Sequence, residues 1–264
     1  MTDWRPEARI RVLTILFLIA LLFSSFLTFD WTQHYFGIVR LSDPEWMYTR
    51  ITKTLTSFLI FILAVTPGND GLNEKDTKKL RLCFILIFSG DMLFLLDELS
   101  LFFDNIAIIM FLMGHIAIIL RNGQGFRKHI QSVRGWGKML REIAIGACMA
   151  AGTAVIFRFT LYGSLAGKPL LYILIVYSVV LVASLWTGWA SLRIGHFPKA
   201  NAAMIAAGAT CFFIGDYIVG FNLSLGAVPE RATTLFLTWV FYTPAILLFA
   251  LSGYRWGNRQ TVSG

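Results

Sequence analysis

Apolar runs of about 20 residues alternate with short polar stretches along the whole chain. A helix that crosses the hydrocarbon core of a membrane needs about 20 such residues. We identify eight runs, at about 12–29, 51–67, 82–98, 104–120, 143–163, 169–190, 200–222 and 233–253. The pattern therefore predicts an all-α protein, a bundle of eight transmembrane helices in one integral membrane domain over residues 1–264.

The first run is not expected to be a cleaved signal peptide. It is followed by further apolar runs and lacks a cleavage site of small residues. The stretches between the runs are short, so no soluble domain is expected within the chain.

The composition agrees with a membrane protein. Hydrophobic residues make up 56% and charged residues 14%, with a mean hydropathy of +0.67, whereas a soluble domain carries roughly 25% charged residues. These values exclude disorder and coiled coils. The three cysteines, Cys83, Cys148 and Cys211, all lie in apolar runs, which argues against a disulfide framework.

The basic residues are distributed unevenly between the two sides of the membrane. If the N-terminus is inside and the sides alternate, 17 of the 23 Lys and Arg residues fall inside. Cytoplasmic loops carry such an excess, so we expect both termini in the cytoplasm. We also expect the membrane to be a bacterial inner membrane. We expect the basic loop 121–141, which contains Trp136, to contact anionic lipid headgroups and not nucleic acid.

Two aspartates lie inside apolar runs, where an ionisable side chain costs roughly 2.5–3.5 kcal/mol and needs a reason. Asp91 follows Gly90 in the third run, and Asp216 follows Gly215 in the seventh. Each glycine removes a side chain from the helix surface and allows close packing or ligand approach. The third and seventh runs cross in the same direction, so the two carboxyl groups can face each other across a bundle.

Each aspartate has two interpretations. One is a hydrogen bond or ion pair that fixes helix packing. The other is a shared functional site, in which two neighbouring carboxyl groups hold one proton between them and provide one acid and one base. The matching Gly-Asp pairs favour the second interpretation, with Asp91 and Asp216 as catalytic residues.

Other polar residues in or near the runs are candidates for substrate binding. Lys53 is either a ligand or a snorkelling side chain at the interface, and Arg158 is either a phosphate clamp or an interface anchor. His115 is either a ligand or a structural hydrogen-bonding group. The full set is Lys53, His115, Arg158, Tyr177, Asn222 and Tyr242.

We expect no metal ion and no organic cofactor. The histidines are His34, His115, His129 and His196, and no two have the spacing of ligands on one helix. Neither a nucleophile elbow nor a Walker loop occurs.

Three segments together resemble a known family. The first is Phe88–Leu95 with Ser89-Gly90-Asp91, the second is Met110–Leu120 with His115, and the third runs from Gly208 through Asp216 to Asn222. In this order they resemble the YhhN-like lysoplasmalogenases, which are eight-span membrane enzymes. The resemblance extends from about Lys53 to Ser252. The family has serine at the position of Gly215.

The resemblance implies that the protein hydrolyses the vinyl ether bond of lysoplasmalogens within the membrane. The products are a fatty aldehyde and a glycerophospho-alcohol, glycerophosphoethanolamine or glycerophosphocholine. Paired carboxyl groups suit this chemistry, because protonation of an enol ether carbon gives an oxocarbenium ion that water captures. The alternative is a lipid-binding or proton-coupled small transporter that uses the same aspartates. A third possibility is a family member with a purely structural role.

Overall fold

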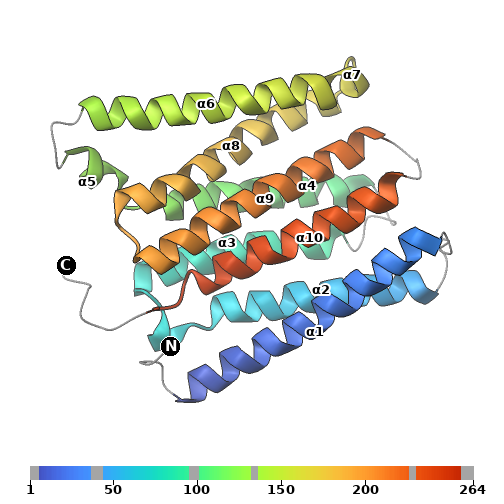
Figure 1. The fold of residues 1–264 in the computed structure, drawn as a ribbon, viewed down its shortest axis with the longest axis horizontal. Helices are drawn as coiled ribbons and strands as arrows, with labels where there is room; N and C mark the ends of the chain where they lie inside the picture. The colour runs from blue at the N-terminus through green and yellow to red at the C-terminus, as the bar shows by residue number, and fades with distance from the viewer. Residues whose placement is uncertain (1–5, 37–43, 95–100, 132–135, 226–229, 257–264) are drawn as a thin grey trace. The chain divides into compact units, whose positions relative to one another are not determined.

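The computed structural model describes residues 6–36, 44–94, 101–131, 136–225 and 230–256. In these ranges the chain is almost entirely helical (Figure 1). The elements are α1 (Pro6–Phe36), α2 (Pro44–Val65), the 3-10 turn η1 (Gly68–Asp70), α3 (Glu74–Phe94), α4 (Leu101–Asn122), α5 (Phe126–Gln131), α6 (Trp136–Thr160), α7 (Tyr162–Leu165), α8 (Leu170–Ile194), α9 (Lys199–Leu225) and α10 (Glu230–Leu251).

The long helices lie over the predicted apolar runs, which confirms the all-α membrane class. Several are longer than their runs: α1 has 31 residues, about 46 Å of helix, because its polar ends remain helical outside the hydrocarbon thickness. Within the described residues, the helices long and apolar enough to cross a membrane are α1, α2, α4, α6, α8 and α9. The apolar part of α10, Phe236–Leu251, is shorter, and α3 carries several charges in its first half. Eight crossings therefore remain a prediction.

The chain divides into two compact units. The first comprises Met1–Gly114 and Ile246–Gly264, and the second comprises His115–Ala245. The division falls within α4 and within α10, so each of these helices contributes one part to each unit.

In the first unit, α2 packs against both α1 and α3 (Figure 1). The segment that follows α10 is fastened to the turn between α2 and α3. The amide of Leu72 donates to the carbonyl of Gly253 (3.0 Å), and the buried Tyr254 hydroxyl donates to the carbonyl of Leu63 (2.7 Å). Burial raises the pKa of Tyr254 to about 12.

In the second unit, α8 packs along α9 and α6 packs against α8 (Figure 1). A side chain at Gly188 on α8 would overlap the Cβ of Ala209 on α9, so the two helices approach closely through small residues, as is typical of membrane helices. An apolar cluster near the start of α8 comprises Phe157, Leu161, Leu165, Leu171 and Leu174.

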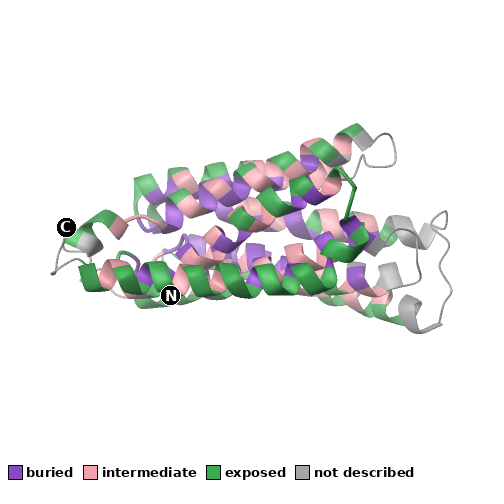
Figure 2. Cartoon of the chain, turned by 90° about the horizontal axis from the view of Figure 1, so that it is seen from above, coloured by how far each residue is buried: buried purple, intermediate pink, exposed green. Residues whose placement is uncertain are grey.

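Large apolar side chains also face outward. Buried and exposed residues alternate along the helices (Figure 2), and the exposed ones include Phe17 and Phe159, which are 68% and 84% exposed. A soluble monomer rarely exposes apolar patches of this kind, whereas lipid-facing surfaces are expected to be apolar.

Candidate active site

The second unit contains a connected set of polar side chains around Asp216. His115 on α4 places Nε2 2.7 Å from Oδ2 of Asp216 on α9. The hydroxyl of Tyr177 on α8 donates to the same oxygen at 2.5 Å. The other ring nitrogen of His115, Nδ1, lies 3.3 Å from Oγ of Ser184 on α8. Three helices thus meet at one carboxyl group.

This set is almost dry. The side chains of His115 and Asp216 are 1% and 9% exposed, and Ser184 is 2% exposed. Polar groups so deeply buried normally have hydrogen-bond partners, and each of these does. The second oxygen of Asp216, Oδ1, accepts no hydrogen bond from the described residues. One oxygen is therefore occupied and the other is available.

Aromatic rings pack against the polar set at His115. Phe212 lies one helical turn before Asp216 on α9, and its ring contacts that of His115 edge to face, with centroids 4.6 Å apart. Tyr242 on α10 packs against Phe212 at 5.6 Å and against Trp239 at 5.3 Å. Phe212 and Tyr242 are 1% and 6% exposed, so the rings give the polar set a buried apolar wall.

Sequence spacing explains how these side chains come together. Tyr177 and Ser184 are seven residues apart, two turns of α8, and therefore lie on one face of the helix. A Cβ at Gly215 would make only ordinary contacts with the α10 backbone, the nearest being 3.5 Å from the amide nitrogen of Tyr242. The glycine before Asp216 thus faces a close helix neighbour, as the Gly-Asp pattern predicts.

Asp91 belongs to the first unit, on α3, and is partly buried. Its preceding glycine also faces a neighbour: a Cβ at Gly90 would overlap the ring of Phe111 on α4. Each in-span aspartate therefore follows a glycine that faces a neighbouring helix of its own unit, and only at Gly90 is the contact too close for a side chain.

Lys53 forms an ion pair within the first unit. Its Nζ lies 2.6 Å from Oδ2 of Asp30, and the two side chains are 13% and 14% exposed. Thr49 donates to the other oxygen of Asp30 at 3.1 Å, and Nζ also lies over the ring of Phe26. A phosphate at Lys53 must therefore compete with Asp30, a residue that the sequence interpretation missed because nothing in the spacing connects the two positions.

Arg158 and Asn222, two other predicted ligands, have partners other than Asp216. Arg158 is exposed, with its guanidinium 4.8 Å from the ring centroid of Tyr162, which favours the interface anchor. Asn222 is buried and accepts a hydrogen bond from Thr234 at 3.0 Å, joining α9 to α10. Of the six predicted ligands, His115 and Tyr177 contact Asp216 directly, and Tyr242 contributes to the aromatic wall.

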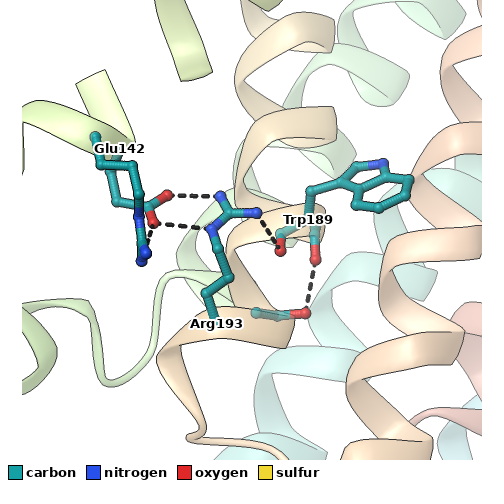
Figure 3. A network of polar contacts seen from close by, with 6 residues as sticks. Glu142, Trp189 and Arg193 are labelled. Carbon is teal, nitrogen blue, oxygen red and sulfur yellow. Dashed lines mark hydrogen bonds and ion pairs between the residues drawn. The ribbon is translucent and has the colours of Figure 1, made fainter. Parts of the chain in front are cut away.

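A second polar network joins α6 to α8. Glu142 is 1% exposed and accepts from Nε and Nη2 of Arg193 at 2.8 and 2.6 Å (Figure 3). Arg193 also donates to the carbonyl of Trp189 at 3.2 Å, and the Trp189 indole donates to Thr210 on α9 at 3.0 Å. By its position in the sequence, Arg193 is one of the 17 basic residues expected on the inner side. In the structure it pairs with a buried glutamate.

These features define the class of the molecule as an all-α membrane protein with a buried carboxyl, imidazole and phenol set in its second unit. The sequence model of the YhhN family matches residues 48–253. The chain belongs to the YhhN family, which confirms the resemblance seen in the sequence. No curated protein and no solved structure matches the chain.

Proposed function

We propose that this protein is an intramembrane hydrolase that cleaves the vinyl ether bond of lysoplasmalogens. Family membership and the matching in-span aspartates support the substrate class. The observation that carries the proposal is Asp216, a nearly buried carboxyl group with two hydrogen-bonding neighbours on one oxygen, a second oxygen without a partner among the described residues, and an aromatic wall.

The reaction needs one proton donor and one proton acceptor. The donor protonates the vinyl carbon remote from the ether oxygen, and the positive charge is shared between the ether oxygen and the adjacent carbon. Water adds to that carbon and loses a proton to the acceptor. The hemiacetal then breaks its bond to the glycerol oxygen, giving an aldehyde and an alcohol. Asp91 and Asp216 supply these two roles, each worth 10²–10⁴-fold in rate by general acid–base catalysis.

The lipid itself fits the chemistry of the surroundings. Its single chain packs among apolar side chains of the helices, within the hydrocarbon region of the membrane. Its phosphate lies near a cation at the interface, Lys53 or Arg158, where a charge-assisted hydrogen bond is strong. The basic loop 121–141 binds anionic headgroups of the surrounding membrane. The glycerophospho-alcohol leaves into water.

The test is turnover by the purified protein in detergent micelles. A 1-alkenyl lysophospholipid is compared with its 1-acyl and 1-alkyl analogues, and aldehyde release is measured. Only the alkenyl lipid should react, because an alkyl ether has no double bond to protonate. In D₂O the product should carry one deuterium on the carbon next to the aldehyde, since protonation occurs on carbon.

Two outcomes would contradict the proposal. Cleavage of the acyl lipid alone would indicate an esterase. If none of the three lipids reacts, the enzyme interpretation fails, and proton uptake coupled to lipid movement in liposomes becomes the assay for the transporter alternative.

A further inference from the structure

The polar side chains of the second unit form a series of hydrogen bonds that ends at Asp216. It runs from Ser184 through His115 to Asp216, with Tyr177 as a second donor to the same carboxyl oxygen. A tyrosine hydroxyl that donates to Oδ2 requires that oxygen to be an acceptor. Donors on one carboxyl oxygen favour the charged form of the group.

The charge of Asp216 determines which ring nitrogen of His115 carries a proton. If Asp216 is ionised, His115 must carry a proton on Nε2 to donate to Oδ2. In the neutral ring, Nδ1 is then an acceptor, and the hydroxyl of Ser184 can donate to it. Such a hydrogen bond to the far nitrogen of a histidine sets which nitrogen carries the proton.

The order serine, histidine, aspartate also occurs in hydrolase triads, where serine is the nucleophile. Here the exposed fractions of the side chains argue against a nucleophilic serine. Ser184 is 2% exposed and His115 is 1% exposed, so neither can meet a substrate. Asp216 is the most exposed of the three, and its Oδ1 accepts no hydrogen bond from the described residues. Of these three side chains, the one that can react with a substrate is therefore the carboxylate of Asp216.

We infer that Ser184, His115 and Tyr177 are positioning residues that hold Asp216 as the carboxylate of the site, so that Asp216 is the base that takes the proton from water. This inference rests on the proposed function, and it assigns the two aspartates different starting states. Asp91 then begins the cycle protonated.

The protons balance through one turnover. Asp91 gives its proton to the vinyl carbon. As water bonds to the cationic carbon, Oδ1 of Asp216 takes the proton that water loses. When the hemiacetal breaks its bond to the glycerol oxygen, Asp216 returns that proton to the leaving oxygen. Asp91 takes the proton of the hemiacetal hydroxyl, and both aspartates regain their starting states.

The first test needs no substrate. The chain has four histidines, so ¹⁵N-labelled histidine gives a simple NMR spectrum, and the His115→Gln variant identifies the His115 signals. We expect a proton on Nε2 of His115 at neutral pH. A bare Nε2 would make Asp216 the proton donor of that hydrogen bond and would overturn the inference.

The second test uses matched serines on one helix. Ser178 also lies on α8, and its hydroxyl donates to the carbonyl of Leu174 in its own helix at 2.7 Å. We expect Ser184→Ala to lower kcat on the order of tenfold, as the loss of a hydrogen bond does, with KM unchanged and with part of the His115 signal moved to the other tautomer. Ser178→Ala should leave kcat, KM and the spectrum unchanged.

Tyr177→Phe removes the second donor and should also lower kcat with KM unchanged. If Ser184→Ala and Tyr177→Phe both keep wild-type kcat, the positioning role is wrong. If wild-type protein turns over no vinyl ether while Nε2 carries the proton, the proposed function fails and the hydrogen-bonding arrangement around His115 stands. The two failures are thus distinguishable.

Discussion

At the scale of single residues, the in-span carboxyl groups are distinguished by what surrounds them. Asp216 is held by His115 and Tyr177 at 2.7 and 2.5 Å, whereas Asp30, at the end of the first apolar run, is neutralised by Lys53. Both carboxyl groups have partners, but of the two only Asp216 keeps an oxygen without a partner among the described residues. Asp216 is therefore the carboxyl group of the two that we propose as catalytic.

The first prediction at this scale concerns the two in-span aspartates. Asparagine is nearly isosteric with aspartate and removes the titrating proton. We expect Asp91→Asn and Asp216→Asn each to lower kcat by about 10²–10⁴-fold while the protein remains folded by circular dichroism. If the two act as a unit, the double variant should be scarcely slower than the slower single variant. Near-normal turnover in either single variant would make that aspartate a packing residue.

The second prediction concerns the phosphate. Lys53→Met and Arg158→Met keep the stems and remove the charges, so at least one of them should raise KM if that cation binds the headgroup. Asp30→Asn provides the complementary test, because it frees Lys53 from its ion pair and should lower KM if Lys53 is the ligand. Unchanged KM in all three variants, measured on the same lipid, would return both cations to structural or interfacial roles.

Some of these residues can be recognised in the sequence and others cannot. Asp91 and Asp216 are visible in the sequence because a charge inside an apolar run is conspicuous. Ser184 is not visible, because a serine in a membrane helix is common and its role depends on His115, 69 positions away along the chain. Asp30 is missed for the same reason: its partner Lys53 is defined by helix packing and not by spacing.

At the scale of elements, polar contacts between helices fix the position of those helices that are largely exposed. Much of α6 is exposed, with Leu140, Ile143, Val155 and Phe159 among its outward side chains. Glu142 is one of its few buried residues and ties α6 to Arg193 on α8. Apolar runs predict such helices well, but they do not predict which helix faces meet.

We therefore predict that Glu142→Gln destabilises the second unit. The change removes the charge opposite Arg193, and hydrogen bonds to charged groups contribute on the order of 1.5–3 kcal/mol. The lower part of this range applies, because Arg193 is partly exposed to solvent. The melting temperature in detergent should fall.

A matched control is the pair Glu74 and Lys78 on α3, 2.7 Å apart but 82% and 71% exposed. Glu74→Gln should leave the melting temperature unchanged, because exposed ion pairs contribute little. Equal effects of the two substitutions would contradict a special role for Glu142.

The segment after α10 gives a second prediction at the element scale. Tyr254→Phe removes the hydrogen bond to the Leu63 carbonyl and should cost about 1 kcal/mol near neutral pH. Burial raises the pKa of Tyr254 from about 10 to about 12, so its contribution to stability is constant below pH 10 and is lost as the pH rises from 10 to 12. The stability difference between wild type and variant should therefore narrow above pH 10 and then change sign, because a rise of two pKa units is worth about 2.7 kcal/mol, more than the hydrogen bond.

Thermal unfolding from pH 7 to 11.5 measures this gap. Tyr172→Phe, on an α8 side chain that is 73% exposed, is the control and should not change the melting temperature at any pH. A gap that stays constant above pH 10 would mean that Tyr254 does not resist ionisation.

At the scale of the whole molecule, the family match and the helices do not cover the same residues. The match runs over residues 48–253, so α1 lies outside it. This helix nonetheless supplies Asp30 to Lys53 and an Arg11 hydrogen bond to the carbonyl of Thr66 at 2.8 Å. The first unit therefore depends on an element beyond the matched region.

The crossing pattern is the last prediction. Of the predicted spans, α3 and the short apolar part of α10 are not long and apolar enough to be identified as membrane-crossing by length and composition. The protein therefore has either eight crossings, as predicted, or fewer. The positions of the basic residues distinguish whether α3 crosses. If α3 crosses, the basic segment 75–81 and the loop 121–141 lie on the same side. If α3 does not cross, α4 carries the loop 121–141 to the opposite side, against the usual inside excess of Lys and Arg.

We therefore expect α3 to cross and both termini to be cytoplasmic. Reporter fusions that are active on only one side of the membrane provide the measurement, placed at Gly264, in the loop 121–141 and between α3 and α4. The first two should report the cytoplasm, and the third should report the outside. A cytoplasmic signal between α3 and α4 would remove α3 from the crossing helices. Asp91 would then no longer lie on a helix that crosses in the same direction as α9, and a shared site with Asp216 would lose its sequence argument.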